Sequence, residues 1–123
     1  DMFHEIRHAA LLAKVASLDA EALGAHAILH AATLGGAKAL GLDAKIGSLL
    51  PGKAADLCAV RLDEWLLQPC YDPASHLVYA AGREQVTHTW VAGKLLMSAG
   101  IPSQIDASEL LDIAGLWHTR LTT

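Results

Sequence analysis

The sequence has little charge, little cysteine and no long uninterrupted apolar run. Charged residues make up only 18% of the chain and hydrophobic residues 53%, which excludes a disordered protein. No run of about 18 apolar residues is present and the start lacks a signal-peptide layout, so we expect no membrane span. Lysine and arginine do not cluster and the formal net charge is -4, which argues against a nucleic-acid partner.

The two cysteines are Cys58 and Cys70, and they form no CxxC motif. Two cysteines in a chain of this length do not make a disulfide framework. The simplest interpretation is a pair of reduced thiols in a cytoplasmic protein. A chain of 123 residues can bury roughly two-thirds of its unfolded surface, which allows one domain with a hydrophobic core.

Helical periodicity dominates the first third of the chain. It predicts a first helix over about 1–15 and a second helix over about 20–32. Apart from Glu21, His26 and His30, the second helix is apolar on all sides, and such a helix is normally buried on all sides. A free-standing domain of this size would struggle to surround it, so the helix suggests a part of something larger.

A short third helix is expected over 33–40, with Thr33 as its cap and Gly41 as its left-handed end. Two glycines at the start of this helix, Gly35 and Gly36, indicate close packing rather than helix propensity. A brief extended segment over 46–49 comes next.

Strands and a final helix are predicted for the rest. A turn at Pro51-Gly52 precedes a strand over 55–62, and a helical turn is expected over 75–81. The pair Ala92-Gly93 joins two extended runs into a β-hairpin over 86–98. Asp106 and Glu109 make a capping box for a last helix that ends near residue 121.

Several motifs, taken in order, resemble the C-terminal part of amidohydrolase-superfamily enzymes, and their order and spacing make the resemblance specific. It is closest to the 5-methylthioadenosine/S-adenosylhomocysteine deaminase branch, whose members are often labelled chlorohydrolases. The motifs are DMF (1–3), ATLGGAKALGL (32–42), IGSL (46–49), PGKAADL (51–57), DPASHLVYAA (72–81) and VTHTWVAGK (86–94).

The resemblance implies an α/β fold, in which a (β/α)8 barrel is joined to a flanking β-sandwich. Residues 1–45 would be the last barrel helices, residues 46–100 part of the sandwich including the hairpin, and residues 101–123 a C-terminal closing helix. The isolated chain would then be α+β. Its first partner would be the missing N-terminal barrel segment of the same protein, and exposed barrel-facing surface would favour a homo-oligomer.

The family chemistry implied is hydrolytic deamination of an adenosine-type nucleoside such as methylthioadenosine or S-adenosylhomocysteine. A divalent metal, zinc or iron, lowers the pKa of a bound water, and the resulting hydroxide attacks a purine ring carbon before ammonia leaves. The family's metal ligands precede the matched region. We therefore expect no catalytic, cofactor-binding or metal-ligating residue in this chain, no bound metal, and no activity of the chain alone.

Two rival functions come from the residues themselves. His4, Glu5 and His8 form a literal HExxH, the pattern of a small zinc hydrolase, although a zincin also needs a third ligand and an edge strand. His26 and His30 repeat the same i, i+4 spacing without a carboxylate or cysteine that completes the set. The second rival is a non-catalytic oligomerisation or binding module with this fold.

Other polar and aromatic residues have simpler interpretations. Gly35 and Gly36 beside Lys38 vaguely suggest an anion site but lack the P-loop spacing. Lys53 and Asp56 are expected to form a local ion pair beside the turn. Further expectations are a core position for Cys58 and either packing or an interface for Trp65, Trp90 and Trp117.

Overall fold

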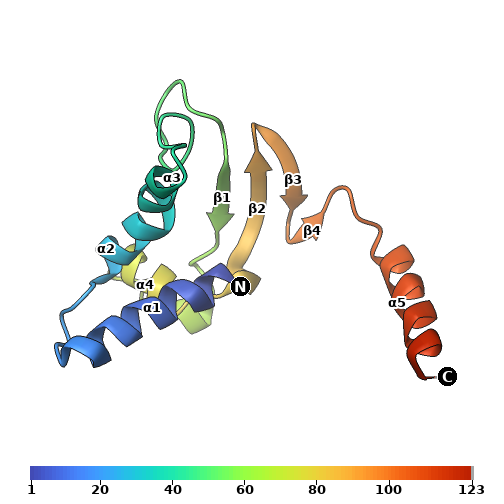
Figure 1. The fold of residues 1–123 in the computed structure, drawn as a ribbon, viewed down its shortest axis with the longest axis horizontal. Helices are drawn as coiled ribbons and strands as arrows, with labels where there is room; N and C mark the ends of the chain where they lie inside the picture. Colours follow the sequence, from blue (N-terminus) through green and yellow to red (C-terminus); the bar gives the residue numbers. More distant parts are fainter. Residues whose placement is uncertain (123) are drawn as a thin grey trace.

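The computed structural model describes residues 1–122. Helices α1 to α4 gather at one end, an antiparallel sheet lies beside them, and α5 stands apart beyond the sheet (Figure 1), so the chain is α+β. The elements are α1 (Met2–Ser17), α2 (Ala25–His30), α3 (Gly36–Ala39), β1 (Leu57–Val60), α4 (Pro73–Tyr79), β2 (Val86–Val91), β3 (Lys94–Ser98), β4 (Ile101–Pro102) and α5 (Ala107–Thr122). A π-helical segment, Ala31–Gly35, lies between α2 and α3, and two 3-10 turns cover Trp65–Leu67 and Arg83–Gln85.

Helix α1 forms where the sequence predicted a helix. The Asp1 carboxylate accepts a hydrogen bond from the Phe3 N–H at 3.0 Å, as an N-cap does. The helix runs two residues past the predicted end, to Ser17, and Leu18 then adopts a left-handed conformation with φ 53°. The amide N–H of Leu18 donates to carbonyls of the last turn, which satisfies groups that a helix end leaves free.

The predicted second and third helices are one continuous helical stretch, so the predicted break at Thr33 is wrong. The Thr33 hydroxyl donates to the Leu29 carbonyl at 2.7 Å, one turn back, and therefore caps nothing. Between α2 and α3 the helix continues as the π-helical segment Ala31–Gly35, in which each hydrogen bond spans one residue more than in an α-helix. The start is also later than predicted, because the Asp19 carboxylate binds the Glu21 N–H in a turn and α2 begins only at Ala25.

The small core lies where α1, α2 and α4 meet. Val78 of α4 is fully buried against Ala10 of α1 and Ile28 of α2. Arg7 of α1 adds a polar connection at the same junction, since its Nε donates to the Val78 carbonyl at 3.1 Å and its Nη2 donates to the Ala81 carbonyl at 2.7 Å. These carbonyls lie at the C-terminal end of α4, where the helix itself supplies no donor.

Asp72 begins α4. Its carboxylate accepts hydrogen bonds from the Ser75 hydroxyl at 2.6 Å, the Ser75 N–H at 3.1 Å and the Ala74 N–H at 3.2 Å. These donors, the Ser75 hydroxyl first, lower the pKa of Asp72 below its usual value, and His26 acts in the same direction. With Pro73 in the first helical position, α4 starts two residues before the predicted helical turn.

The sheet is antiparallel in the order β1-β2-β3-β4. The predicted hairpin is confirmed with its predicted strand bounds, and its turn residues Ala92 and Gly93 both have positive φ, 49° and 75°. This pair of conformations fits a two-residue turn whose twist matches the strands. The Asp56 carboxylate accepts a hydrogen bond from the Ala92 N–H, which ties the turn to the start of β1.

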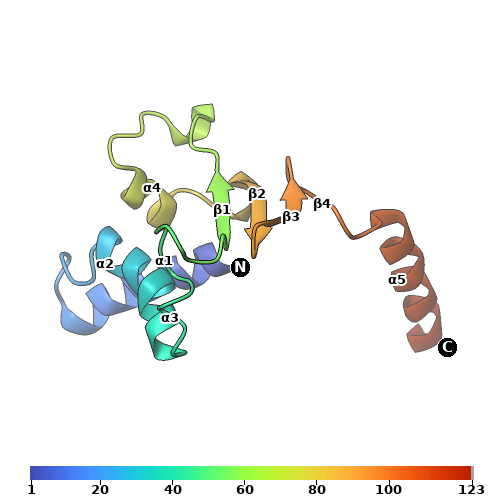
Figure 2. The same cartoon turned by 90° about the horizontal axis from the view of Figure 1, so that it is seen from above.

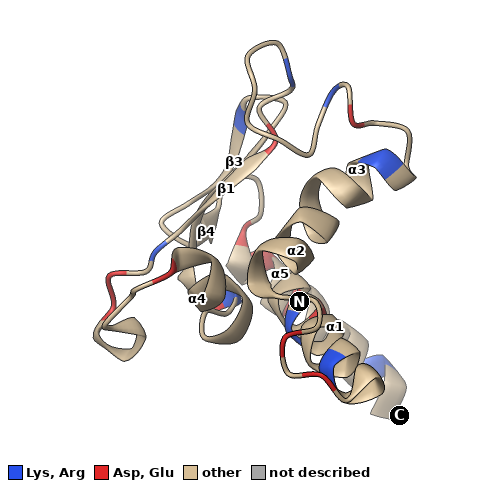
Figure 3. Cartoon of the chain, turned by 90° about the vertical axis from the view of Figure 1, so that its left-hand side faces the viewer, with Lys and Arg blue, Asp and Glu red and all other residues tan. Residues whose placement is uncertain are grey.

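Much of the apolar surface is uncovered. The chain exposes 8869 Å², whereas a free-standing globular protein of 13.0 kDa exposes about 6,300 Å². The helix over about 20–32 that was predicted to be buried on all sides has one buried residue, Ile28. Figure 3 shows that charged residues lie mainly in turns and loops, and the stretch from α2 to α3 carries only Lys38.

Cys58 is exposed, so its predicted core position is wrong for this chain. Strand β1 pairs with β2, and Cys58 lines an open groove beside β1. Trp65 and Trp117 are also exposed, at 81% and 56%, whereas Trp90 is half-buried and its ring lies 5.5 Å from the ring of His88 in a stacked arrangement. Among residues 1–122, none of the helices has the length and apolar character that crossing a membrane requires.

Two alanine substitutions should differ strongly in their effect on stability, because one lies in the core where α1, α2 and α4 meet and the other lies on the exposed side of α1. Val78→Ala should lower the free energy of unfolding of the 123-residue chain by about 2 kcal/mol, because two buried methyl groups are lost and a cavity remains. Leu12→Ala, on the exposed side of α1, should change it by less than about 0.5 kcal/mol. Urea denaturation followed by circular dichroism measures both, and equal effects would contradict the proposed core.

The Asp72 cap predicts an acid-sensitive stability. A carboxylate whose pKa is lowered by folding stabilises the folded state at pH values above its unfolded pKa of about 3.9. This stabilisation is lost as the pH falls through the folded pKa. The Asp72→Asn variant should therefore show a smaller decrease in melting temperature than the unaltered chain when the pH is lowered from about 5 to about 2.

The matched control is Asp63→Asn, which changes an exposed carboxylate 3.9 Å from Arg61 that begins no helix. This variant should keep the slope of the unaltered chain. If the Asp72 and Asp63 variants gave the same pH profile, the cap would not be the source of the acid sensitivity.

Candidate functional site

The HExxH residues lie on one exposed side of α1. The rings of His4 and His8 are 6.2 Å apart between centroids and tilted by 49°, and Glu5 is exposed beside them. A zinc site needs at least a third protein ligand. Within residues 1–122, no group of three or more histidine, cysteine, aspartate or glutamate side chains is placed to hold a metal ion. The geometry therefore does not support a zincin site.

The second histidine pair is divided between two environments. His26 Nε2 lies 3.8 Å from the Asp72 carboxylate, with 84% of the histidine side chain exposed, so the contact is a surface ion pair when the ring is protonated. His30 is exposed one turn further along. Asp72 comes close through the packing of α4 on α2, which spacing in the sequence could not show. The Asp72 carboxylate already accepts hydrogen bonds from the Ala74 and Ser75 N–H groups at the start of α4.

Gly35 and Gly36 lie inside a continuous helical stretch, where the backbone N–H groups are used in the helix, so the suggested anion site has no helix start to build on. Close packing does occur nearby, at Gly47, where φ is 84°. A Cβ atom there would lie 2.6 Å from the Ala37 Cβ and 3.0 Å from the Leu34 Cα. The loop after α3 therefore runs directly against the helix.

The expected ion pair between Lys53 and Asp56 is absent. Each of the two side chains forms hydrogen bonds with backbone groups instead. Lys53 Nζ donates to the carbonyls of Asp43 and Ile46, while Asp56 accepts from the Ala92 N–H. Each side chain reaches backbone groups that the turns leave unpaired, and these bonds compete with the ion pair. The two residues fix the loop and the hairpin turn.

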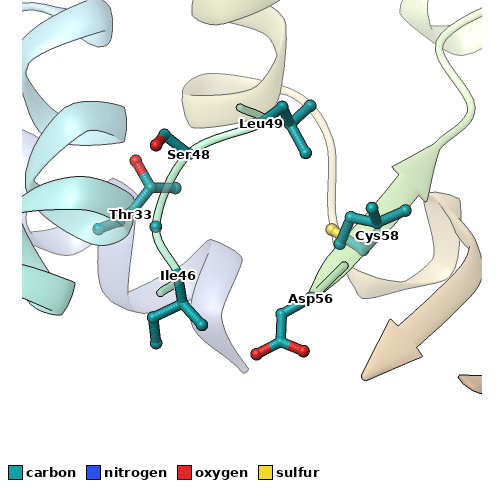
Figure 4. A pocket seen from close by; sticks show the side chains of 9 residues that line it. Thr33, Ile46, Ser48, Leu49, Asp56 and Cys58 are labelled. Carbon is teal, nitrogen blue, oxygen red and sulfur yellow. The ribbon is translucent and has the colours of Figure 1, made fainter. Parts of the chain in front are cut away.

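A groove of about 380 Å³ lies between the π-helical segment Ala31–Gly35, the loop after α3 and the start of β1. Figure 4 shows the side chains of Thr33 and Ser48 on one wall and those of Asp56 and Cys58 on the other. The lining residues are Ala32, Thr33, Ile46, Gly47, Ser48, Leu49, Asp56, Leu57 and Cys58.

The groove is suited to packing rather than to catalysis. Most of its lining is apolar, Asp56 is engaged by the hairpin turn, and its lining residues include no histidine, lysine or arginine that could serve as a base or bind an anion. The Ser48 Oγ is buried without a hydrogen-bond partner, which is unfavourable unless a further group satisfies it. An apolar groove with one unsatisfied hydroxyl fits a covering segment of polypeptide.

Sequence reasoning missed Arg7 and Asp72, the two side chains that position α4. Asp72 could have been found, because Asp-Pro followed by a helical pattern is a start signal for a helix. Arg7 could not, since its acceptors lie 71 and 74 residues away in the sequence.

Comparison with known proteins gives consistent matches. The sequence profile of the Amidohydrolase family matches residues 1–96. A curated 5-methylthioadenosine/S-adenosylhomocysteine deaminase of Teredinibacter turnerae is 40% identical over 121 residues, which are 98% of this chain and 27% of that protein. A 5'-deoxyadenosine deaminase of Methanosarcina mazei is 40% identical over 93% of this chain and 26% of its own length.

Solved structures agree with these sequence matches. The crystal structure of an adenosine deaminase from Xanthomonas campestris with bound zinc matches 99% of this chain and 28% of its own, with a TM-score of 0.93 and 47% identity. Atrazine chlorohydrolase from Arthrobacter aurescens, complexed with zinc, matches 93% of this chain and 25% of its own, with a TM-score of 0.82 and 28% identity. The chain thus spans about a quarter of the length of these relatives. This chain belongs to the amidohydrolase family.

Proposed function

We propose that the chain is the C-terminal, structural portion of a metal-dependent aminohydrolase that deaminates an adenosine-type nucleoside. The observation that carries this proposal is the agreement of two independent matches over nearly the whole chain. One is to a methylthioadenosine/S-adenosylhomocysteine deaminase in sequence and the other to an adenosine deaminase in structure. Both matches cover only about a quarter of the length of the matched protein, so the catalytic residues of the parent would lie outside this chain.

The surface of the chain supports a role as part of a larger fold. It exposes about 2,500 Å² more than a free-standing globular protein of its mass. Large side chains of α1 such as Leu12 and Val15 are 67% and 70% exposed, and the groove beside β1 is apolar and open. Contiguous uncovered apolar surface marks an interaction site. In the parent, the preceding segment of the same polypeptide would cover it.

In this proposal residues 1–45 are the last helices of a (β/α)8 barrel and residues 46–100 belong to a flanking β-sandwich. In support of this division, α1 to α3 fall in the first range and β1 to β3 fall in the second, while α4 of the second range packs on α1 and α2 where the two parts meet. Residues 101–123 would be a C-terminal closing helix, and α5 (Ala107–Thr122) falls within this range. Specificity for a particular nucleoside would be set by barrel loops elsewhere in the parent.

Zinc is the metal we propose for the parent, because the adenosine deaminase and the atrazine chlorohydrolase above both hold zinc. The residues of this chain do not fit a metal site: across 1–122, no three suitable side chains converge. Ligands would therefore come from the remainder of the parent. A cytoplasmic location is supported by Cys58 and Cys70, which are both free thiols.

The first test uses the protein encoded by the whole reading frame that contains this chain. It should hold about one zinc per subunit and release ammonia from methylthioadenosine, S-adenosylhomocysteine or adenosine, whereas the 123-residue chain alone should release none. Metal content by plasma mass spectrometry and ammonia release by a coupled assay measure this. A full reading frame without an HxH motif, or without bound metal, would contradict the proposal.

The second test addresses the HExxH alternative on the 123-residue chain itself. We expect no stoichiometric zinc after purification, because His4 and His8 lack a third ligand among the described residues. His8→Ala should then leave the metal content unchanged. About one zinc per chain, lost in the His8→Ala variant, would show that the α1 histidines form a site and that the structural role is not the whole function.

A further inference from the structure

Helix α5 is the most isolated element of the fold. Every described residue from 98 to 122 is exposed, and Figures 1 and 2 both show α5 set apart from the helices and the sheet. In proteins, most of the stability of a helix comes from the packing of its apolar face rather than from its own sequence. Helix α5 therefore needs a packing surface that the described part of this chain does not supply.

Helix α5 has the same placement in a longer folded chain. The zinc-bound adenosine deaminase matches 99% of this chain with a TM-score of 0.93. Helix α5 contains 16 of the 123 residues, so that score could not be reached if α5 lay elsewhere in the matched structure. This chain covers 28% of the matched chain, so most of that polypeptide lies outside the match and is available to cover the helix.

Two other relatives extend this observation. Atrazine chlorohydrolase is only 28% identical, yet it matches 93% of this chain, so the residues outside the match are fewer than the 16 of α5. The deaminase of Teredinibacter turnerae matches 121 residues of this chain, which are 27% of its own length. In all three proteins, a counterpart of at least part of α5 thus belongs to a chain about four times as long as this one.

The apolar face of α5 is broad. At 3.6 residues per turn, six apolar residues fall within an arc of about 120° that contains no polar residue. An arc wider than about 100° is typical of a helix that packs on a globular body, whereas the pairing of two helices needs only a narrower seam. The six residues are Ala107, Leu110, Ile113, Ala114, Trp117 and Leu121.

The link between the hairpin and α5 is short. The Ser103 N–H donates to the Leu96 carbonyl at 2.8 Å, and the Ser103 Oγ donates to the Leu95 carbonyl at 3.1 Å. From this anchored residue the chain reaches the first residue of α5, Ala107, within at most about 14 Å. The surface that α5 covers therefore begins next to the hairpin.

The same polypeptide is the source of that surface which the length of the relatives favours. A body in the same chain is held beside α5 in every molecule, whereas a second copy reaches α5 only at concentrations near the dissociation constant of the pair. A broad apolar face left open in each monomer would also promote aggregation.

We propose that α5 is an intramolecular clasp, whose broad apolar face packs on the part of the same polypeptide that lies outside these 123 residues. Trp117 and Leu110, which are 56% and 53% exposed in this chain, become buried in that contact. Since the start of the clasp is anchored at Ser103, the contact ties the hairpin to the remainder of the parent. The inference rests on the proposed function, because that function supplies the longer parent.

The first experiment asks which chain α5 touches, and it uses the full parent protein. The photoreactive residue p-benzoylphenylalanine replaces Trp117, the protein is irradiated, and the products are separated by mass under denaturing conditions. The adduct should keep the mass of one subunit, and peptide mapping should join α5 to a segment outside the 123 residues. The same replacement at Leu116, which is 64% exposed and lies outside the arc, should form far less adduct.

The second experiment measures amide hydrogen exchange of residues 107–122 in the full parent. Trp117→Ala should speed this exchange at least about tenfold, because truncating a packed tryptophan favours local opening of the helix. Leu110→Ala is a smaller truncation on the same face and should act in the same direction. Leu116→Ala is the matched control and should leave the exchange rates within about threefold of the unaltered protein.

Four results would overturn the inference. An adduct of twice the subunit mass would assign α5 to a second copy, and an adduct with residues 1–106 would mean that α5 folds back on this chain. Unprotected amides throughout 107–122 in the parent would show that nothing covers the helix. Equal effects of the Trp117 and Leu116 variants would show that the broad face is not the contact.

Zinc content and ammonia release are measured on the same samples. A parent that shows the expected adduct and exchange but lacks zinc or activity would contradict the proposed function and leave the clasp standing. A parent with zinc and activity but with one of the four results above would contradict the clasp alone.

Discussion

The junction of α1, α2 and α4 holds the described fold together. Val78 is fully buried there, and the Arg7 guanidinium binds the carbonyls of Val78 and Ala81, which the end of α4 would otherwise leave without donors. Because α4 leads directly into the turn before β2, the same junction sets where the sheet begins relative to the helices. The Asp72 carboxylate secures the other end of α4, so both ends of this short helix are fixed by charged side chains.

Elements with local signals were predictable from sequence. The hairpin was predicted with its strand bounds because Ala92-Gly93 supplies two positive φ values between extended runs, and α1 and the last helix were predicted from Asp1 and Asp106 as caps. The helical stretch from Ala25 to Ala39 was divided wrongly. Thr33 has the chemistry of a cap, but in the folded chain its hydroxyl returns to the Leu29 carbonyl.

The positions of side chains relative to the core were harder to predict than the elements. Cys58 and the apolar helix were expected to be buried because their sequence context is apolar, whereas the structure leaves Cys58 exposed and buries one residue, Ile28, of that helix. Whether a side chain is buried depends on everything that packs around it in the complete protein. The sequence motifs indicated the family correctly and predicted that the ligand-bearing part lies elsewhere, whereas the contact of Arg7 with α4 required the fold itself.

The contact of Gly47 with the helix determines which sequence changes the groove can accept. A side chain at position 47 would meet the Ala37 Cβ at 2.6 Å, and it would also meet the Leu34 Cα at 3.0 Å and the Thr33 carbonyl at 3.1 Å. Glycine at position 37 would remove the shortest of these contacts, but the two contacts with backbone atoms would remain. The wall of the groove formed by the loop is therefore shaped by the close approach of the Gly47 backbone to the helix backbone and to the small Ala37 side chain. Its contour should persist while the side chains around it vary, so that evolution can alter the chemistry of the groove without altering its form.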